Sequence, residues 1–160
     1  MRKLNFLGIG PKIAVILLPW LLISFVLSTH YRKVFAFTPE KSSLLFLSGV
    51  VILVFGLIFY GSTVRLLLKG LKETRLLTNG AFRLCQNPLY ASIILFIIPA
   101  LSLIFNSWLI LTSSITGYIL FKINIKKEYI ELEKFFGGEY LKYKNETPEF
   151  FPIQIKKWFR

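Results

Sequence analysis

Three long stretches of the chain carry no charged side chain. They run from residue 13 to 29, from 42 to 64 and from 84 to 121. A helix needs about 20 apolar residues to cross the hydrocarbon core of a bilayer. The first two stretches therefore predict one crossing each. The third is long enough for two crossings, with Asn106 and Ser107 as a polar turn near its middle.

This pattern predicts an all-α integral membrane protein that forms a single membrane-embedded domain over residues 1–160. The four transmembrane helices are expected at about residues 12–29, 43–65, 88–106 and 107–125. Residues 126–160 are expected to form a cytoplasmic tail. The tail begins as a helical extension of the fourth span, and Gly137-Gly138 is expected to end that helix.

The composition and the charge distribution support a membrane location. Of the 160 residues, 54% are hydrophobic, which is more than a soluble domain of this size needs. With the N-terminus in the cytoplasm, only Arg32, Lys33 and Lys41 of the 20 Lys and Arg residues fall on the outer side. This asymmetry predicts that both termini are cytoplasmic. We interpret the net charge of +12 as attraction to anionic lipid headgroups rather than to nucleic acid.

Several kinds of catalytic or metal site are not expected. The chain has one cysteine, Cys85, one histidine, His30, and no aspartate. A zinc site needs a cluster of such ligands, and a Ser-His-Asp triad needs the missing acid. Any chemistry must therefore use glutamate, amides, tyrosine, basic side chains and the backbone, and we expect no bound metal.

Residues 77–90 form a turn-rich, basic loop that leads into an apolar helix. Asn87 is expected to be the N-cap of this helix, and Pro88 suits its first position. The free N–H groups of the next three residues would then point back into the loop, where they attract an anionic group. On their own, these residues are more typical of an ordinary helix cap.

Two stretches of sequence, taken in order, carry a resemblance to a known family. The first is Leu77-Thr78-Asn79-Gly80-Ala81-Phe82-Arg83 followed by Asn87-Pro88-Leu89-Tyr90. The second comprises Glu128, Leu132, Phe136-Gly137, Tyr140, Tyr143, Pro148 and Pro152. With a predicted helical hairpin between them, they resemble the isoprenylcysteine carboxyl methyltransferase family and the related phospholipid methyltransferases. The resemblance spans residues 74–152.

The resemblance implies a membrane-embedded methyltransferase that uses S-adenosylmethionine and acts on a lipophilic acceptor. The cofactor-binding residues that it implies are Thr74, Arg75, Leu76, Leu77, Phe82, Asn87, Pro88, Leu89, Tyr90 and Glu128. The substrate-binding position that it implies is Asn124, where the prenylcysteine enzymes have an arginine for the substrate's carboxylate. No catalytic residue is assigned, because methyl transfer needs alignment and desolvation more than acid–base groups.

The chemistry of these residues suits that cofactor. The N–H groups after Pro88 suit its carboxylate. Glu128 suits its ammonium or its ribose hydroxyls. Phe82 and Tyr90 suit the adenine or, by cation–π attraction, the sulfonium. In the alternative interpretation, Glu128 is only a solvated helix charge and the tyrosines are interfacial anchors.

The chain departs from the family pattern at several positions, and two other functions stay open. Gln86-Asn87 stands where the family has Arg-His, and Tyr129 replaces the second glutamate of a pair. Asn124 lacks the arginine's charge, which favours an acceptor other than a prenylcysteine. One alternative is a phospholipid or small-lipid amine N-methyltransferase. The other is a non-enzymatic membrane protein of the same fold.

Overall fold

The structure is a computed structural model that describes residues 8–40, 42–73 and 75–150. Over these residues, all of the regular secondary structure is helical. The helices in chain order are α1 (Gly10–His30), α2 (Arg32–Phe35), α3 (Ser43–Glu73), α4 (Ala81–Leu84), α5 (Pro88–Ala91), the π-helix η1 (Ser92–Ile97), α6 (Ile98–Ile104), α7 (Trp108–Phe136) and α8 (Gly138–Glu146). The predicted fold class is confirmed in this respect.

Three helices are long and apolar enough to cross a membrane: Gly10–His30, Ser43–Gly70 and Trp108–Phe136. The segment expected to be the third of four spans is the shorter apolar helix Pro88–Ile104, made of α5, η1 and α6. It ends before the predicted boundary because Asn106 adopts a left-handed backbone conformation with φ of 51°. The structure therefore supports three full-length spans and one shorter apolar helix.

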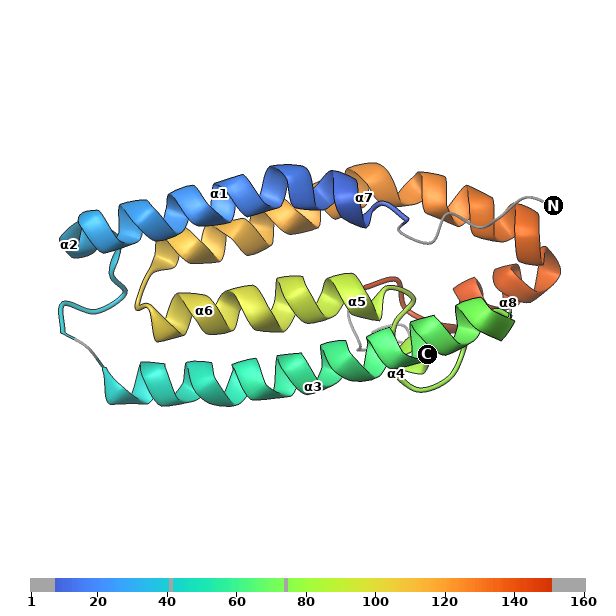
Figure 1. The fold of residues 1–160 in the computed structure, drawn as a ribbon, viewed down its shortest axis with the longest axis horizontal. Helices are drawn as coiled ribbons and strands as arrows, with labels where there is room; N and C mark the ends of the chain where they lie inside the picture. Colours follow the sequence, from blue (N-terminus) through green and yellow to red (C-terminus); the bar gives the residue numbers. More distant parts are fainter. Residues whose placement is uncertain (1–7, 41, 74, 151–160) are drawn as a thin grey trace, which may run out of the picture.

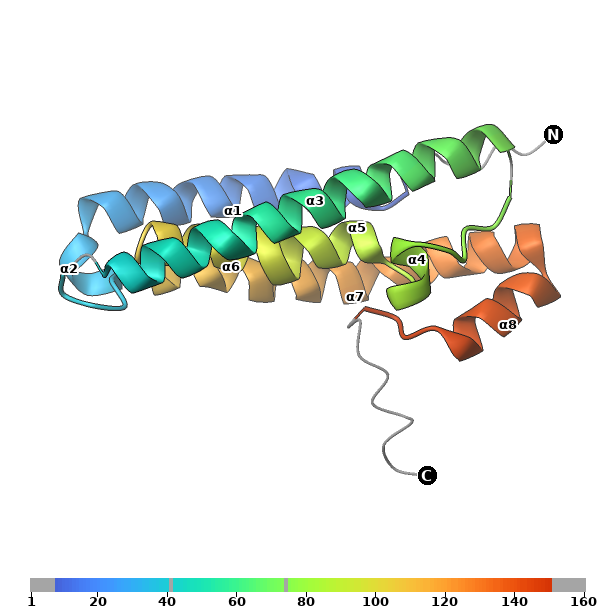
Figure 2. The ribbon, with the colours of Figure 1, turned by 90° about the horizontal axis from the view of Figure 1, so that it is seen from below.

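The helices form an elongated bundle (Figures 1 and 2). Helix α1 runs along α7, and α3 runs along η1 and α6. One end of the bundle carries α2 and the turn between α6 and α7. The opposite end carries the start of α1, helices α4 and α5, the end of α7 and helix α8. The loop and the helical extension identified in the sequence thus share one end of the molecule.

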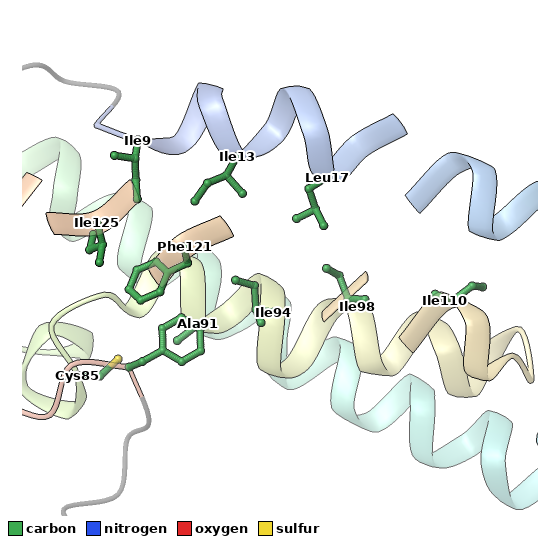
Figure 3. Close-up of a cluster of buried hydrophobic side chains, with 11 residues drawn as sticks. Ile9, Ile13, Leu17, Cys85, Ala91, Ile94, Ile98, Ile110, Phe121 and Ile125 are labelled. Atoms are coloured by element: carbon green, nitrogen blue, oxygen red, sulfur yellow. The ribbon is translucent and has the colours of Figure 1, made fainter. Parts of the chain in front are cut away.

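The surface of the bundle is apolar along its long helices. Large side chains point outward from α1 and α3, and Leu22, Leu44 and Ile58 are each more than 60% exposed. Soluble proteins rarely expose such continuous apolar faces, whereas lipid tails cover them in a membrane. The interior holds one hydrophobic cluster of α1, α5, η1, α6 and α7, shown in Figure 3. Length, composition and exposure therefore agree on a membrane protein.

The predicted polar turn between the last two long segments is present. The Asn106 side-chain oxygen accepts the backbone N–H groups of Phe37 and Thr38, both at 3.2 Å. Its side-chain nitrogen donates to the Thr38 carbonyl at 2.9 Å. The adjacent Ser107 hydroxyl bonds that of Ser28 in α1 at 2.6 Å. The turn thereby fastens α6 and α7 to the connection between α1 and α3.

Helix α7 continues well past the residues expected to lie in the membrane. It runs without a break to Phe136 and ends at Gly137, as the two consecutive glycines predicted. Gly137 has φ of 55°, and α8 then turns back beside α7. This extension carries Glu128 and brings α8 next to the loop that precedes α5.

Candidate functional site

Glu128 meets residues from two distant parts of the chain. Its carboxylate Oε2 accepts the backbone N–H of Ile9 at 3.4 Å. The Tyr90 hydroxyl, at the start of the Pro88–Ile104 helix, lies close enough to interact electrostatically with this carboxylate. The first and second halves of the sequence motif therefore lie close together. Their role in cofactor binding stays a prediction.

The turn that begins α1 covers this pair of side chains. Gly8 has φ of +47°, and a Cβ at this position would lie 2.7 Å from Glu128 Oε2. Only glycine combines this backbone conformation with such a close approach. Gly10 leaves room for Tyr90, whose hydroxyl would lie 3.8 Å from a Cβ there. Sequence reasoning missed this element, although the two glycines around Ile9 were a signal of a tight approach.

Tyr140 on α8 contributes a free hydroxyl to the same region. Its side chain is only 1% exposed, and its oxygen has no hydrogen-bond partner among the residues that the structure describes. Burial raises the pKa of Tyr140, and the charge of nearby Glu128 raises it further. Buried hydroxyls normally have partners, so one without a partner among the described residues could donate to a polar ligand.

Tyr143, one turn further along α8, holds the motif loop instead. Its hydroxyl donates to the Phe82 carbonyl at 2.7 Å. Burial is the main cause that raises the pKa of Tyr143, so this hydroxyl keeps its proton and remains a donor. The Phe82 side chain is half-buried. The loop is therefore fixed to α8 through its backbone.

Asn87 stands at the helix start as predicted, but its side chain does not cap the helix. The residue occupies the N-cap position of α5, but its side chain makes no capping hydrogen bond. Its nitrogen instead donates to the Tyr129 hydroxyl at 2.6 Å and to the Glu149 carbonyl at 2.8 Å. The backbone carbonyl of Asn87 accepts the Ala91 N–H at 3.0 Å. One of the three N–H groups expected to be free is therefore used within the helix.

Gln86 fastens the segment that follows α8. Its side-chain nitrogen donates to the carbonyls of Lys144 at 3.1 Å and Thr147 at 2.6 Å. Its backbone N–H donates to the Pro148 carbonyl at 2.9 Å. The amides of Gln86 and Asn87 thus hold the end of the described chain against the loop.

Tyr129 stands beside a carboxylate supplied from elsewhere in the chain. Its hydroxyl donates to Glu149 Oε1 at 3.3 Å. The other oxygen of Glu149 pairs with the Lys122 ammonium. Tyr129 thus lies beside the carboxylate of Glu149, which comes from the segment after α8. No signal in the sequence pointed to Glu149.

The remaining predicted site residues lie in two places. Asn124 is one helical turn before Glu128 on α7, and its side-chain nitrogen donates to the Leu120 carbonyl at 2.8 Å. The Arg75 N–H donates to the Gly70 carbonyl at 3.3 Å, and Leu77 packs over Gly70 at the end of α3. Leu76 is half-buried beside them, as is Leu89 after the fully buried Pro88. Thr74 lies outside the described residues.

Cys85, in the loop of residues 77–90, belongs to the hydrophobic cluster (Figure 3). It is fully buried, and burial raises the pKa of its thiol to about 11. A buried thiol with a raised pKa is a poor nucleophile and a poor metal ligand. Over the described ranges, no three or more His, Cys, Asp or Glu side chains are grouped so that they could hold a metal ion.

Comparison with known proteins found no matching protein-family model, no matching curated protein and no matching solved structure. Glu128, the residues around it and the motif to which they belong are therefore the basis for a functional proposal.

Proposed function

We propose that this protein is a membrane-embedded methyltransferase that uses S-adenosylmethionine and acts on a lipophilic acceptor. The observation that carries the proposal is that Glu128 lies close to Tyr90, and that its charge also reaches Tyr140. The buried Tyr140 hydroxyl has no hydrogen-bond partner among the described residues. These residues come from both halves of a motif that resembles one family. Two unrelated structural motifs would have no reason to meet around a charged group.

The donors and acceptors at this place suit the polar parts of the cofactor. A carboxylate has about four acceptor positions, and Glu128 uses one of them for the Ile9 N–H. The cofactor's ammonium or its ribose hydroxyls would take the others. The Tyr140 hydroxyl would donate to the cofactor's carboxylate or accept from its adenine. The Tyr90 ring offers a face for the sulfonium.

The proposal includes a topology with the site on the cytoplasmic side. The Pro88–Ile104 helix would be the fourth membrane segment, and the bilayer would accommodate its short length by local thinning. Both termini, the end of α7 and α8 would then face the cytoplasm. Apart from Arg32, Lys33 and Lys41, every lysine and arginine would lie on that side, in agreement with the positive-inside rule.

The bound cofactor supplies an electrophilic methyl group on a positively charged sulfur. When bound, it would supply this methyl group to an acceptor oxygen or nitrogen and leave as S-adenosylhomocysteine. The chain's own residues contribute by alignment: Glu128 and Tyr140 orient the polar groups of the cofactor, and the aromatic side chains exclude water. Asn124, one turn from Glu128, would contact the acceptor.

The test is calorimetry with S-adenosylhomocysteine on the purified full-length protein in detergent. Glu128→Gln should weaken binding by about 1.5–3 kcal/mol, the scale of a hydrogen bond to a charged group. Glu131→Gln is the matched control, because Glu131 is exposed on the same helix and should leave the affinity unchanged. Equal affinities for wild type and Glu128→Gln would contradict the proposed role of Glu128. No binding to the wild type would contradict the function.

A second candidate function is a non-enzymatic membrane protein of the same fold. The observation that favours it is that Gln86, Asn87 and Glu128 all make internal contacts. The calorimetry separates the two functions. If the cofactor binds, incubation with labelled S-adenosylmethionine and mass spectrometry of lipids and prenylcysteine analogues would identify the acceptor. This second measurement also distinguishes an O-methyltransferase from a phospholipid or small-lipid amine N-methyltransferase.

A further inference from the structure

A partly enclosed cavity of about 520 Å³ lies between α1, α2, α3 and the end of α6. Its volume falls within the range of roughly 300–1,000 Å³ that is usual for small-ligand sites. Asn106 borders this cavity just before α7 begins, whereas Glu128 lies about 30 Å further along that helix, at 1.5 Å per residue. The cavity is therefore distinct from the candidate methyltransferase site and lies at the other end of the bundle.

One side of the cavity is a wall of apolar side chains. Phe25 from α1 and Phe105 after α6 meet edge to face, with 4.8 Å between their ring centroids. Phe46 from α3 and Leu103 from α6 extend this wall. Phe25, Phe46 and Phe105 are each at least 37% exposed, so the wall continues onto the outer surface of the bundle. Such a wall suits a hydrocarbon chain that continues into the bilayer.

The other side of the cavity carries a cation and hydroxyl groups. Arg32 is exposed, and over residues 8–40, 42–73 and 75–150 no carboxylate forms an ion pair with it. Ser42 and Ser43 lie across from it at the start of α3. The Ser42 oxygen accepts the Leu45 N–H at 3.4 Å, which leaves the hydroxyl proton available to a ligand. An unpaired guanidinium next to hydroxyl donors is a good partner for a phosphate group.

Aromatic side chains place this end of the bundle at a membrane–water interface. Trp108 is 43% exposed, and its indole nitrogen donates to the Val34 carbonyl at 3.2 Å. Tyr31 and Phe37 are exposed around the same end. Tryptophan and tyrosine gather at the level of the lipid headgroups. Arg32 and the serines are therefore at the depth where a phospholipid carries its phosphate.

We propose that this cavity binds one anionic phospholipid. Its phosphate pairs with Arg32 and the Ser42 and Ser43 hydroxyls, and the first part of one acyl chain lies against the Phe25–Phe105 wall. The cavity is too small for a whole lipid, so the remaining chains stay in the bilayer. This lipid site is independent of methyl transfer, because it is at the opposite end from Glu128.

The test uses the full-length protein in a neutral detergent, titrated with phosphatidylglycerol and followed by native mass spectrometry. Arg32→Gln should weaken binding about tenfold or more, because it removes a charge-assisted pair. Lys33→Gln is the matched control, because Lys33 is the next cation in α2 and does not line the cavity. Ser43→Trp should block the cavity while keeping Arg32. Leu44→Trp is its control, because Leu44 is 74% exposed and outside the cavity.

Each outcome bears on the proposal. The proposal is supported if Arg32→Gln and Ser43→Trp bind the lipid more weakly while both controls bind it like the wild type. Thermal unfolding without lipid must be the same for all five proteins. Equal binding by Arg32→Gln and Lys33→Gln overturns it. Phosphatidylcholine binding as tightly as phosphatidylglycerol would show that the net charge is not recognised. Glycerol 3-phosphate displacing the lipid at equal concentration would show a site for small anions and not for a lipid.

Discussion

Replacing Asn87 with alanine should destabilise the protein strongly, whether or not the residue touches a cofactor. The side chain is 6% exposed and donates to the Tyr129 hydroxyl and to the Glu149 carbonyl. Each hydrogen bond contributes about 0.5–1.5 kcal/mol, and an acceptor left buried without a donor adds about 1–3 kcal/mol. We therefore expect Asn87→Ala to lower the free energy of unfolding by about 2–4 kcal/mol.

A double-mutant cycle with Tyr129→Phe tests whether this loss comes from the contacts described. Tyr129→Phe removes the acceptor of one Asn87 hydrogen bond and the donor to the Glu149 carboxylate. Contacting residues usually show an interaction energy of about 0.5–3 kcal/mol. The free energies should be measured by reversible denaturant unfolding of the detergent-solubilised protein. Additive effects, within about 0.5 kcal/mol, would refute the reasoning because they would mean that the two side chains do not interact.

Asn145→Ala provides the matched control for this cycle. Asn145 is an asparagine on α8 close to the same segment, but its side chain is exposed. Surface substitutions of this kind usually change stability by less than about 0.5 kcal/mol. A loss as large as that of Asn87→Ala would indicate that α8 responds to any substitution, and the specific role given to Asn87 would be wrong.

Two further predictions concern Cys85 and the packing of α3. The folded protein keeps the Cys85 proton up to about pH 11, whereas the unfolded chain releases it from the ordinary pKa of 9.0. The free energy of unfolding should therefore fall as the pH rises between these two values. Denaturant unfolding at several pH values would measure this fall, which should be smaller in Cys85→Ala. A Cβ at Gly56 would lie 2.8 Å from Phe96 Cβ, so Gly56→Ala should cost about 1–3 kcal/mol in the same unfolding assay. Gly61→Ala, with open space around it, should be neutral or stabilising, and equal effects at Gly56 and Gly61 would contradict the packing.

The sequence predicted the helices well because lipid-facing helices obey simple rules. Long charge-free stretches gave α1, α3 and α7, since a spanning segment must satisfy its backbone hydrogen bonds internally. Asn106 was expected to mark a turn, because a polar pair interrupts an apolar stretch. The sequence could not reveal that the Pro88–Ile104 helix is shorter than the others. Its end depends on hydrogen bonds that the Asn106 side chain accepts from residues 68 or 69 positions earlier in the chain.

The environment of the candidate site was less predictable, because it depends on contacts between distant residues. The Ile9 N–H reaches Glu128 over a separation of 119 residues, and Asn87 reaches the Glu149 carbonyl over 62. Local propensity correctly favoured Asn87 at a helix start. Its side-chain amide is instead oriented by a hydrogen bond to the Glu149 carbonyl, in the segment that follows α8. The proximity of Glu128 and Tyr90 could be predicted only because both residues belong to the same motif. Nothing in the local sequence distinguished Glu149 from the other glutamates.

The contact between Glu128 and the turn at Ile9 constrains how a ligand could bind. The hydrogen bond from Ile9 is 3.4 Å long, so it stabilises the carboxylate less than an optimal bond would. A cationic ligand would add a hydrogen bond in which both the donor and the acceptor are charged. The ligand therefore does not need to displace the turn, provided that it approaches the carboxylate from the side of Tyr140. Since Gly8 and Gly10 bring the backbone onto Glu128 and Tyr90, the turn can form one wall of the site rather than an obstruction.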